Sequence, residues 1–422
     1  VTVSSGDTLD LNEQRMECSG LLDNQGTMDV DGGLIFAADL NLDADYTNES
    51  GLNAVVMTGA TNFDFGDGEL TSGTFMINSS GTATMGGVAQ GGNLLVGCGT
   101  LDMNNTSNSF GNVTIATGGT MTAGSGTLTC SGDFTTSGGL LGASCVVLDG
   151  AGDYLISDAF TDDRNTANNG NYTVEFWMRQ TAEAEHDEYI FDYTNGSNNL
   201  NRSRCFIDAG SSDCLYWQTY SAGGSSHGAL RSTAFTTNID DSKWHHVALV
   251  FIGVGNTHDG VTYPKGRREM WIDGKLNAFD NETSSGGNFG YDQGTSMKIV
   301  WGANGNSLGT TTQCMTGNLD EMRIWSDGRT QSEIRANMFS QVAADSANLR
   351  HHYPANTGSG STVSDDATDT TGEAHLDVDL TLTNDATWAG SGTFTRGTST
   401  LVMAKSGTQT INIIGGTFVE NL

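Results

Sequence analysis

The two flanks of this chain have almost no histidine, proline, tryptophan or positive charge. All eight histidines, both prolines, six of the seven tryptophans and fifteen of the eighteen lysines and arginines lie between Cys145 and Leu376. Residues 1–144 and 377–422 are rich instead in glycine, threonine, serine, asparagine and aspartate. Such a composition shift marks domain boundaries. We expect a repetitive scaffold in 1–144, a globular domain in 145–376 and a resumed scaffold in 377–422.

Positive charge is scarce throughout the chain. Fifty aspartates and glutamates stand against 18 lysines and arginines, which gives a formal net charge of -32. In residues 1–144, Arg15 alone faces 16 acidic residues. A surface of this sign repels phosphate backbones and anionic lipid head groups. The charge therefore argues against nucleic acid as a partner and leaves cations and neutral polar ligands.

Long hydrophobic runs are also missing. No apolar run approaches the roughly 20 residues that a membrane-spanning helix needs, and no charged-then-apolar signal segment opens the chain. We expect no membrane insertion. Because residue 1 is Val1 and the sequence stops inside a repeat, we expect the chain to be part of a longer polypeptide.

The seven cysteines contain no C-x-x-C and no paired Cys/His spacing, which argues against a zinc site. Cys205 and Cys214 are spaced so that a hairpin disulfide could join them. The alternative is that all seven are small buried hydrophobic residues.

The flanks repeat short glycine-bounded units in which apolar and polar residues alternate. Examples are Gly26-Thr-Met-Asp-Val, Gly81-Thr-Ala-Thr-Met, Gly99-Thr-Leu-Asp-Met, Gly119-Thr-Met-Thr-Ala and Gly126-Thr-Leu-Thr-Cys. Alternation is typical of a half-buried strand. Short strands at regular spacing predict a β-solenoid, in which each coil buries its inward side chains on its neighbours. A β-sandwich or an irregular β-prism is the alternative.

The same kind of unit returns after the middle segment. Gly99-Thr-Leu-Asp-Met followed by Ser109–Ile115 matches Ser399-Thr-Leu-Val-Met followed by Thr417–Leu422. The globular domain is therefore expected to be an insertion into a continuing solenoid. Since stacked coils leave open strand edges, we expect contacts with other copies or with neighbouring structural subunits.

The middle segment carries alternating strand patterns separated by turn residues, which predict an antiparallel sandwich. Thr330 and Glu333 form a capping-box pattern at the start of a short helix over Thr330–Met338. The expected strands are Cys145–Leu148, Tyr172–Arg179, Leu215–Tyr220, His246–Ile252, Glu269–Lys275 and Leu319–Trp325.

Five motifs of this segment stand in the order seen in laminin-G-like, concanavalin A-like lectin/glucanase jelly rolls, and the segment resembles that superfamily. They are Leu148-Asp-Gly-Ala-Gly-Asp-Tyr-Leu155, Tyr172-Thr-Val-Glu-Phe-Trp177, Trp244-His-His-Val-Ala-Leu-Val250, Trp271-Ile-Asp-Gly-Lys275 and Gly317-Asn-Leu-Asp-Glu-Met-Arg-Ile-Trp325. The predicted fold class is all-β, with β-solenoid-like flanks and an inserted antiparallel jelly roll. The superfamily hosts lectins, glycosidases, adhesion modules and spacers, so the resemblance does not choose a function.

The sequence offers weak support for catalysis. Glucanases of the resembling superfamily carry paired carboxylates as E-x-D-x-E or E-x-D-x-x-E, and Glu185-His-Asp-Glu-Tyr-Ile190 departs from both patterns. We expect that run to be a solvated loop. Adjacent residues of a strand point to opposite faces, so His245 and His246 are expected to be structural. His351 and His352 are expected in a loop, without a ligand partner. We predict that the protein is not an enzyme.

Calcium is the expected cofactor, because acidic sandwich loops supply the oxygen ligands that it prefers. In the resembling family a structural ion often joins the first and last strands, which implies Asp149 and Asp320 here, with Asp153 as a third candidate. The alternative is that Asp149 caps a turn with Gly150 and that Asp320 is hydrogen-bonded in its strand.

Four residues are the candidate sugar-binding set: Tyr216, Tyr220, Trp301 and Asn304. Sugars place apolar C–H faces on aromatic rings and hydroxyls on polar side chains. Alternation puts Tyr216 and Tyr220 on one face of a strand with Gln218, and Trp217 on the other. The remaining tryptophans of the domain are assigned to the core, namely Trp177, Trp244, Trp271 and Trp325.

Together these features resemble, in style, virion fibre or decoration proteins of marine phages and large bacterial adhesins. We therefore expect a structural and adhesive component of a virion surface or cell surface that contacts surface carbohydrate. A dedicated lectin of a secreted bacterial adhesin is the second hypothesis, and a glycoside hydrolase is the third.

Overall fold

The computed structural model contains β-strands and one short helix in the part of the chain that it describes. Two compact units are distinguished: Val1–Ser144 with Arg335–Ser340 and Ala389–Leu422, and Cys145–Ile334 with Gln341–Trp388. The structure describes all residues except 13, 30–32, 43–45, 48–53, 65–72, 88–90, 165–169, 183, 185, 197–198, 210–213, 222, 234–238, 240, 282–294, 309–312, 369–377, 384–385, 389–391, 396–399, 404–410 and 414–422.

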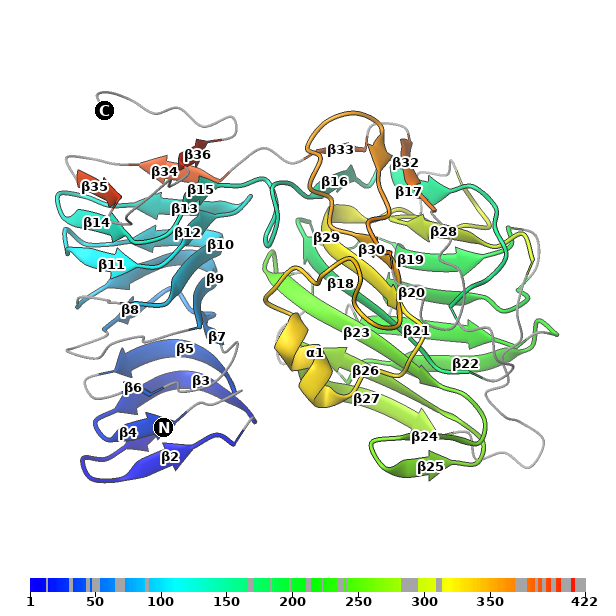
Figure 1. Cartoon of the computed structure of the whole chain (residues 1–422), viewed down its shortest axis with the longest axis horizontal. Coiled ribbons are helices and arrows are strands. Elements are labelled where there is room, and N and C mark those ends of the chain that lie inside the picture. The colour runs from blue at the N-terminus through cyan, green and yellow to red at the C-terminus, as the bar shows by residue number, and fades with distance from the viewer. Residues whose placement is uncertain are drawn as a thin grey trace. The chain divides into compact units, whose positions relative to one another are not determined.

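The first unit is a β-solenoid, as predicted, and its strand pairs are parallel (Figure 1). A 12-stranded sheet runs along it, with a three-stranded sheet at each of two further positions. The long sheet consists of β1 (Thr2–Val3), β3 (Arg15–Asn24), β5 (Leu34–Leu42), β7 (Ala54–Met57), β8 (Asn62–Phe63), β9 (Thr74–Met85), β10 (Asn93–Asp102), β12 (Val113–Ile115), β13 (Gly119–Thr122), β15 (Phe134–Thr136), β34 (Thr393–Thr395) and β36 (Ile411–Ile413). The shorter sheets are β2 (Thr8–Asp10), β4 (Thr27–Asp29) and β6 (Tyr46–Thr47), and β11 (Asn108–Phe110), β14 (Thr127–Cys130) and β35 (Thr400–Met403).

Stacking of like residues builds the solenoid core. One inward column steps from coil to coil at spacings of 20, 20, 19, 19 and 21 residues through Ile35, Val55, Phe75, Leu94, Val113 and Phe134. All six side chains are buried in one hydrophobic cluster. Because each coil repeats the alternation of the coil below, apolar side chains meet apolar ones along the whole stack.

The glycines that open the repeated units have a steric reason. A Cβ atom at Gly119 would overlap the carbonyl oxygen of Val96 in the preceding coil, and one at Gly126 would overlap that of Thr106. Only glycine lets the backbones approach this closely. The Gly-Thr signal of the sequence therefore marks the corners where one coil rests on the next.

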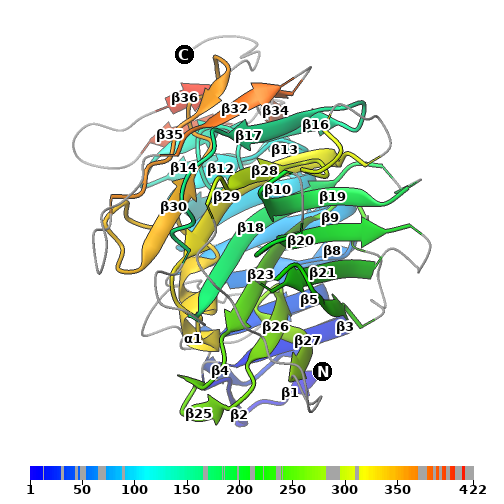
Figure 2. The ribbon, with the colours of Figure 1, turned by 90° about the vertical axis from the view of Figure 1, so that its right-hand side faces the viewer.

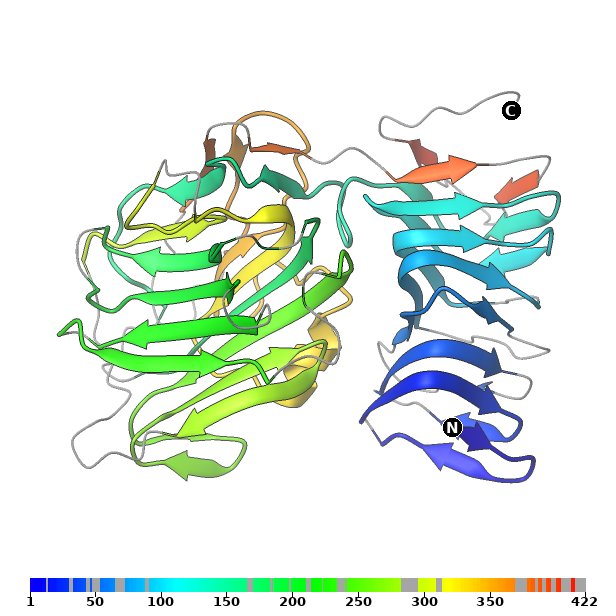
Figure 3. The ribbon, with the colours of Figure 1, turned by 180° about the vertical axis from the view of Figure 1, so that it is seen from behind.

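The stack continues beyond the inserted domain, as Figure 3 shows from behind. β34 pairs with β13, β35 with β14 and β36 with β15. The repeated unit returns after the insertion, as predicted: Thr400–Met403 stacks on β14, the strand of the Gly126 unit, whereas the Gly99 unit in β10 pairs with β13. Every column carries the same alternation, so the sequence pattern alone does not identify the column. The part of the match at Thr417–Leu422 lies outside the described residues.

The second unit is an antiparallel sandwich of two eight-stranded sheets (Figure 2). The first sheet has the order β27 (Lys275–Asn281), β26 (Arg267–Ile272), β23 (Trp244–Ile252), β18 (Tyr172–Gln180), β29 (Thr316–Trp325), β16 (Val146–Asp149) and β33 (Thr387–Trp388), with β30 (Leu349–Tyr353) beside β29. The second sheet has the order β22 (Ser226–Arg231), β21 (Cys214–Tyr220), β20 (Ser203–Asp208), β19 (Glu188–Thr194), β28 (Lys298–Trp301), β17 (Tyr154–Ser157), β32 (Leu380–Thr383) and β31 (Thr362–Val363). A separate hairpin joins β24 (Asn256–His258) and β25 (Val261–Tyr263).

The predicted boundary after Leu376 is too early. β32 pairs with β17 and β33 pairs with β16, both antiparallel, so the sandwich extends to Trp388. The sequence Leu380-Thr-Leu-Thr alternates in the same way as a solenoid unit. Only the identity of its long-range partner assigns this strand to the sandwich.

Local signals within the sandwich are largely confirmed. α1 spans Gln331–Asn337, and Thr330 and Glu333 make the predicted capping box, with the Thr330 N–H donating to Glu333 Oε2 at 2.8 Å. The strand expected over Glu269–Lys275 is divided by a tight turn at Asp273 and Gly274, where φ is 50° and 70°. Asp-Gly favours such a two-residue turn, so that signal was present in the sequence.

Candidate functional site

The outer face of the second sheet carries an aromatic ladder over β19, β20 and β21. Core-facing residues alternate with outward ones, and Cys205, Ile207, Leu215 and Trp217 lie in the main core. The outward residues between them stack: the ring centroids of Tyr189 and Phe206 are 4.8 Å apart and those of Phe206 and Tyr216 are 5.3 Å apart. We call Tyr189, Phe206 and Tyr216 the aromatic ladder.

A set of polar side chains borders the aromatic ladder. The Arg204 guanidinium donates from Nε to Gln218 Oε1 at 2.8 Å and from Nη2 to the Tyr220 hydroxyl oxygen at 3.1 Å. Arg231, which is exposed, lies over the Tyr216 ring at 4.4 Å. We call Arg204, Gln218, Tyr220 and Arg231 the polar rim. Cation–π contact and hydrogen bonds hold these donors and acceptors in place.

Tyr216 and Tyr220 therefore share a face, as the alternation indicates, but their roles differ. Tyr216 is 4% exposed and supports Arg231, whereas Tyr220 is 9% exposed and presents its hydroxyl group to the polar rim. Arg204 and Phe206 were not among the residues predicted for this site. The alternation of Ser203-Arg-Cys-Phe-Ile-Asp208, with Arg204 and Phe206 in phase, was the signal that identifies them.

Trp301 does not lie at this site, and its assignment to the sugar-binding set is wrong. It is 0% exposed and packs in the main core against Phe176 and Phe191, with ring centroids at 5.4 and 4.7 Å. β28 is a central strand of the second sheet, so its alternate residues enter the sandwich interior.

Asn304 is buried in a different cluster. Its Oδ1 accepts hydrogen bonds from Arg202 Nη2 at 2.6 Å and from the Asn306 N–H at 3.1 Å, and its Nδ2 donates to Gln313 at 2.8 Å. Arg202 is itself ion-paired with Asp192. These contacts occupy the amide of Asn304 and make it a structural residue of the loop rather than part of the aromatic face.

The three predicted calcium ligands do not converge. Asp149 of β16 lies opposite Thr316 of β29. Thr316 is four residues before Asp320 on that strand, so Asp149 and Asp320 are separated by roughly 13 Å along the strand direction. Asp320 is buried and accepts the Glu321 N–H at 2.9 Å. Asp149 accepts the Ala151 N–H at 2.7 Å, the turn-capping alternative named above. Asp153 lies near Asp149, whose N–H donates to Asp153 Oδ2 at 3.0 Å.

This geometry does not fit one calcium ion held by all three aspartates. Among the described residues, no group of three or more histidine, cysteine, aspartate or glutamate side chains is arranged to hold a metal. Of the three predicted calcium ligands, Asp149 and Asp153 are the two that lie near each other.

His245 and His246 point to opposite sides of β23, as predicted. His245 bridges Asp273 at 2.9 Å and Asp241 at 3.1 Å. Burial opposes protonation, yet these two carboxylates raise the pKa of His245 to about 10. Burial, with the positive Arg323 nearby, lowers the pKa of His246 to about 3. Both histidines are structural elements of the first sheet.

The expectation for His351 and His352 is wrong. Both lie in β30 and are buried, and His351 bridges Asp365 at 2.6 Å and Asp163 at 2.9 Å. Burial opposes its protonation, but the two carboxylates raise the pKa of His351 to about 10. His352 contacts Glu321 at 3.0 Å. These partners are 14 to 188 residues away in the chain, so the sequence spacing could not reveal them.

Two carboxylates beside the aromatic ladder, those of Asp187 and Asp208, are direct neighbours. Burial and a hydrogen-bonded neighbouring carboxylate, Asp208, raise the pKa of Asp187. Glycosidases hold their two carboxyl groups about 5 to 9.5 Å apart, farther than hydrogen-bonding distance. Of the run Glu185–Ile190, residue 185 lies outside the described residues, and Glu188–Ile190 begin the buried strand β19 rather than a solvated loop.

Cys205 and Cys214 lie on opposite faces of the second sheet and form no disulfide. The disulfide alternative is therefore wrong, and all seven cysteines are buried. Within the described residues, no helix has the length and hydropathy of a membrane-spanning segment.

Comparison with solved structures finds several proteins similar to this chain at low identity. A Bacteroides ovatus protein described as carbohydrate-binding is 17% identical, over 58% of this chain and 58% of that one, with a TM-score of 0.39. A heptameric SAP-like pentraxin from Limulus polyphemus is 12% identical over 57% and 96%, with a TM-score of 0.32. The CBM40 domain of the Ruminococcus gnavus IT-sialidase is 13% identical over 46% and 95%, also at 0.32.

The family comparison concerns the sandwich alone. Among curated proteins, none matches the sequence of this chain. This chain spans 58% of the length of the Bacteroides ovatus protein. Residues 149–335 match the family model of the concanavalin A-like lectin/glucanases superfamily, which confirms for this part of the chain the resemblance carried by its five motifs.

Proposed function

We propose that the sandwich binds surface carbohydrate through the polar rim of its second sheet. The observation that carries this proposal is the rim itself, in which Arg204, Gln218 and Tyr220 are joined by hydrogen bonds above the aromatic ladder. Guanidinium, amide and phenol groups offer several donors and acceptors at fixed positions, as sugar hydroxyls require. The ladder rigidifies these groups, so little side-chain freedom is lost on binding.

The proposal for the whole chain is a structural and adhesive component of a virion surface or cell surface, without enzymatic activity. The solenoid supplies a repetitive scaffold, and the inserted sandwich supplies the contact surface. Many copies on one particle would strengthen a weak individual interaction through multivalency. We also propose that the chain contacts other copies of itself or neighbouring structural subunits. The alternative is that it is a dedicated lectin of a secreted bacterial adhesin.

A glycan array with the full chain tests the carbohydrate proposal. We expect Gln218→Ala with Arg231→Ala to reduce binding at least tenfold, about 1.4 kcal/mol, because Gln218 is half-buried and Arg231 is exposed in the rim. The melting temperature should stay that of the parent. Lys275→Ala, which removes an exposed cation from the first sheet, is the matched control and should bind as the parent does.

Two outcomes would contradict the proposal. One is an array on which the parent binds no glycan. The other is a double variant that retains full binding, which would make the polar rim a structural feature. Release of sugar from polysaccharides by the purified chain would instead support the hydrolase hypothesis.

A further inference from the structure

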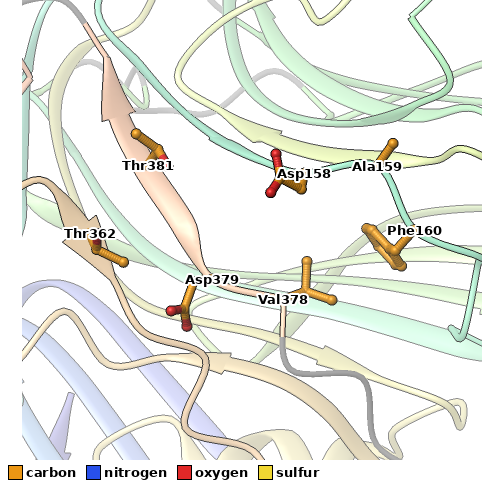
Figure 4. Close-up of a pocket in the computed structure, with 7 residues that line it drawn as sticks. All are labelled: Asp158, Ala159, Phe160, Thr362, Val378, Asp379 and Thr381. Atoms are coloured by element: carbon orange, nitrogen blue, oxygen red, sulfur yellow. The ribbon is translucent and has the colours of Figure 1, made fainter.

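A pocket of 440 Å³ lies at the other end of the second sheet, over β17, β32 and β31. Small-molecule sites have volumes of roughly 300 to 1,000 Å³. Figure 4 shows Asp158, Ala159 and Phe160 on one side of the open space and Thr362, Asp379 and Thr381 on the other, with Val378 between them. None of these residues belongs to the aromatic ladder or to the polar rim.

Strand register brings the polar side chains of this pocket together. Thr362 and Thr381 are directly opposite each other on β31 and β32, so their Cβ atoms are about 4.5 to 5.5 Å apart on one face. Thr381 is also opposite Ile156 of β17, whose side chain points away from the main core. The two hydroxyl groups therefore lie on the outer face of the second sheet.

Two carboxylates complete the polar lining. Asp158 directly follows β17, and Asp379 directly precedes β32. One oxygen of Asp379 accepts the backbone N–H of Asp365 at 2.9 Å, which fixes the orientation of its carboxylate. Both side chains are exposed, and neither forms an ion pair with any residue that the structure describes. An ionised carboxylate only accepts hydrogen bonds, so a ligand here must supply donors.

An aromatic ring forms the apolar wall of the pocket. Phe160 makes edge contacts with Tyr193 and His351, with ring centroids 5.8 and 5.6 Å away. Its backbone is tied to Met297 by two hydrogen bonds of 2.8 and 2.9 Å. The ring is thus held in position beside the buried Val378. A fixed ring next to paired acceptors suits a ligand with one apolar face and several hydroxyl groups.

We propose that this pocket is a second saccharide-binding site, specific for a neutral sugar unit. Asp158 and Asp379 accept hydrogen bonds from sugar hydroxyls, Thr362 and Thr381 add two further hydroxyl groups, and Phe160 faces the C–H groups. The two carboxylates repel uronic acids and other anionic sugars. The proposal shares its ligand class with the proposed function but uses separate residues.

Saturation-transfer NMR of the full chain with single sugars tests this site. The neutral probes are glucose, galactose and mannose, and the matched anionic probes are glucuronate and galacturonate. We expect at least one neutral sugar to bind and its uronate to bind at least tenfold more weakly. Asp158→Ala with Asp379→Ala should weaken the neutral sugar at least tenfold, while Asp345→Ala, an exposed carboxylate outside the pocket, leaves it unchanged.

The variants separate this proposal from the previous one. Gln218→Ala with Arg231→Ala should leave binding of the neutral sugar at the pocket intact. Absence of binding by every neutral probe, a uronate that binds as tightly as its neutral parent, or full binding by the Asp158 and Asp379 variant would each overturn the pocket proposal. None of these results bears on binding by the polar rim to larger glycans on the array.

Discussion

The solenoid and the sandwich bury different kinds of polar side chain. In the described part of Val1–Ser144 the buried polar residues are all uncharged: Asn24, Asn78, Ser79, Asn108, Thr136, Ser137 and Ser144. The sandwich buries ion pairs between different segments, such as Arg323 of β29 with Glu175 of β18 at 3.7 Å, and Arg202 with Asp192. Both units are β-structures of similar strand length, so the difference arises from how their strands are paired.

Parallel stacking explains why the described residues of Val1–Ser144 bury no charged side chain. Each coil places its residues on the equivalent residues of the next coil, so a repeated charge would meet a like charge, which destabilises a sheet. The antiparallel sandwich joins unlike segments, and opposite charges can meet across it. In this chain the repetitive unit stacks neutral side chains, whereas the non-repetitive unit uses specific ion pairs.

The largest expected effect comes from breaking the ion pairs of the sandwich. Arg323 contacts Glu321 and lies 3.7 Å from Glu175, and all three are buried. Arg323→Met leaves two buried carboxylates without this cation, so we expect the free energy of unfolding to fall by about 3 to 5 kcal/mol. All seven tryptophans lie in the sandwich, so urea unfolding followed by tryptophan fluorescence measures this unit.

The matched control for that variant is Ile77→Val in the solenoid, where no charge is involved. Loss of one buried methylene group should cost about 1 kcal/mol. It should alter the circular dichroism transition and leave the tryptophan transition unchanged. If Arg323→Met unfolds at the same urea concentration as the parent, apolar packing can replace the buried charges, and the two units do not differ in their dependence on ion pairs.

A second effect is expected at alkaline pH, and again in the sandwich alone. The pKa values of His245 and His351 are raised from 6.5 to about 10. A histidine whose pKa is higher in the folded state stabilises that state fully below its unfolded-state pKa of 6.5. This stabilisation is lost as the pH rises through the folded-state pKa of about 10. We expect the melting temperature of the sandwich to fall between pH 7 and pH 10, whereas the solenoid, which has no histidine, keeps its own.

The pH effect should depend on these two residues. Replacing both His245 and His351 with glutamine should flatten the melting profile of the sandwich above pH 7. A parent protein whose tryptophan-detected melting is the same at pH 7 and pH 10 would contradict the assignment of these histidines as protonated bridges.

The smallest expected effect concerns calcium, which stays a prediction limited to Asp149 and Asp153. A weak ion held by two carboxylates at a free concentration equal to its Kd would stabilise the sandwich by about 0.4 kcal/mol. Chelation should then lower the melting temperature of the sandwich slightly, and Asp153→Asn should remove that difference. Identical melting of the parent with and without chelator would end the calcium prediction for this chain.

Alternation, glycine placement and capping are local, and for that reason the sequence alone predicted much of this protein. Gly119 and Gly126 mark solenoid corners, Thr330 with Glu333 starts the helix, and the five motifs identify the sandwich. The shared face of Tyr216 and Tyr220 also follows from their spacing.

Pairing between distant segments was decided only by the tertiary structure. Trp301 became a core residue because β28 lies inside the second sheet, and His351 became a buried bridge because Asp163 is 188 residues away. Leu380–Thr383 alternates like a solenoid strand, yet it pairs with β17 of the sandwich. The period of a strand states which side chains share a face, but not which strand lies beside it, because that choice depends on the packing of the whole sheet.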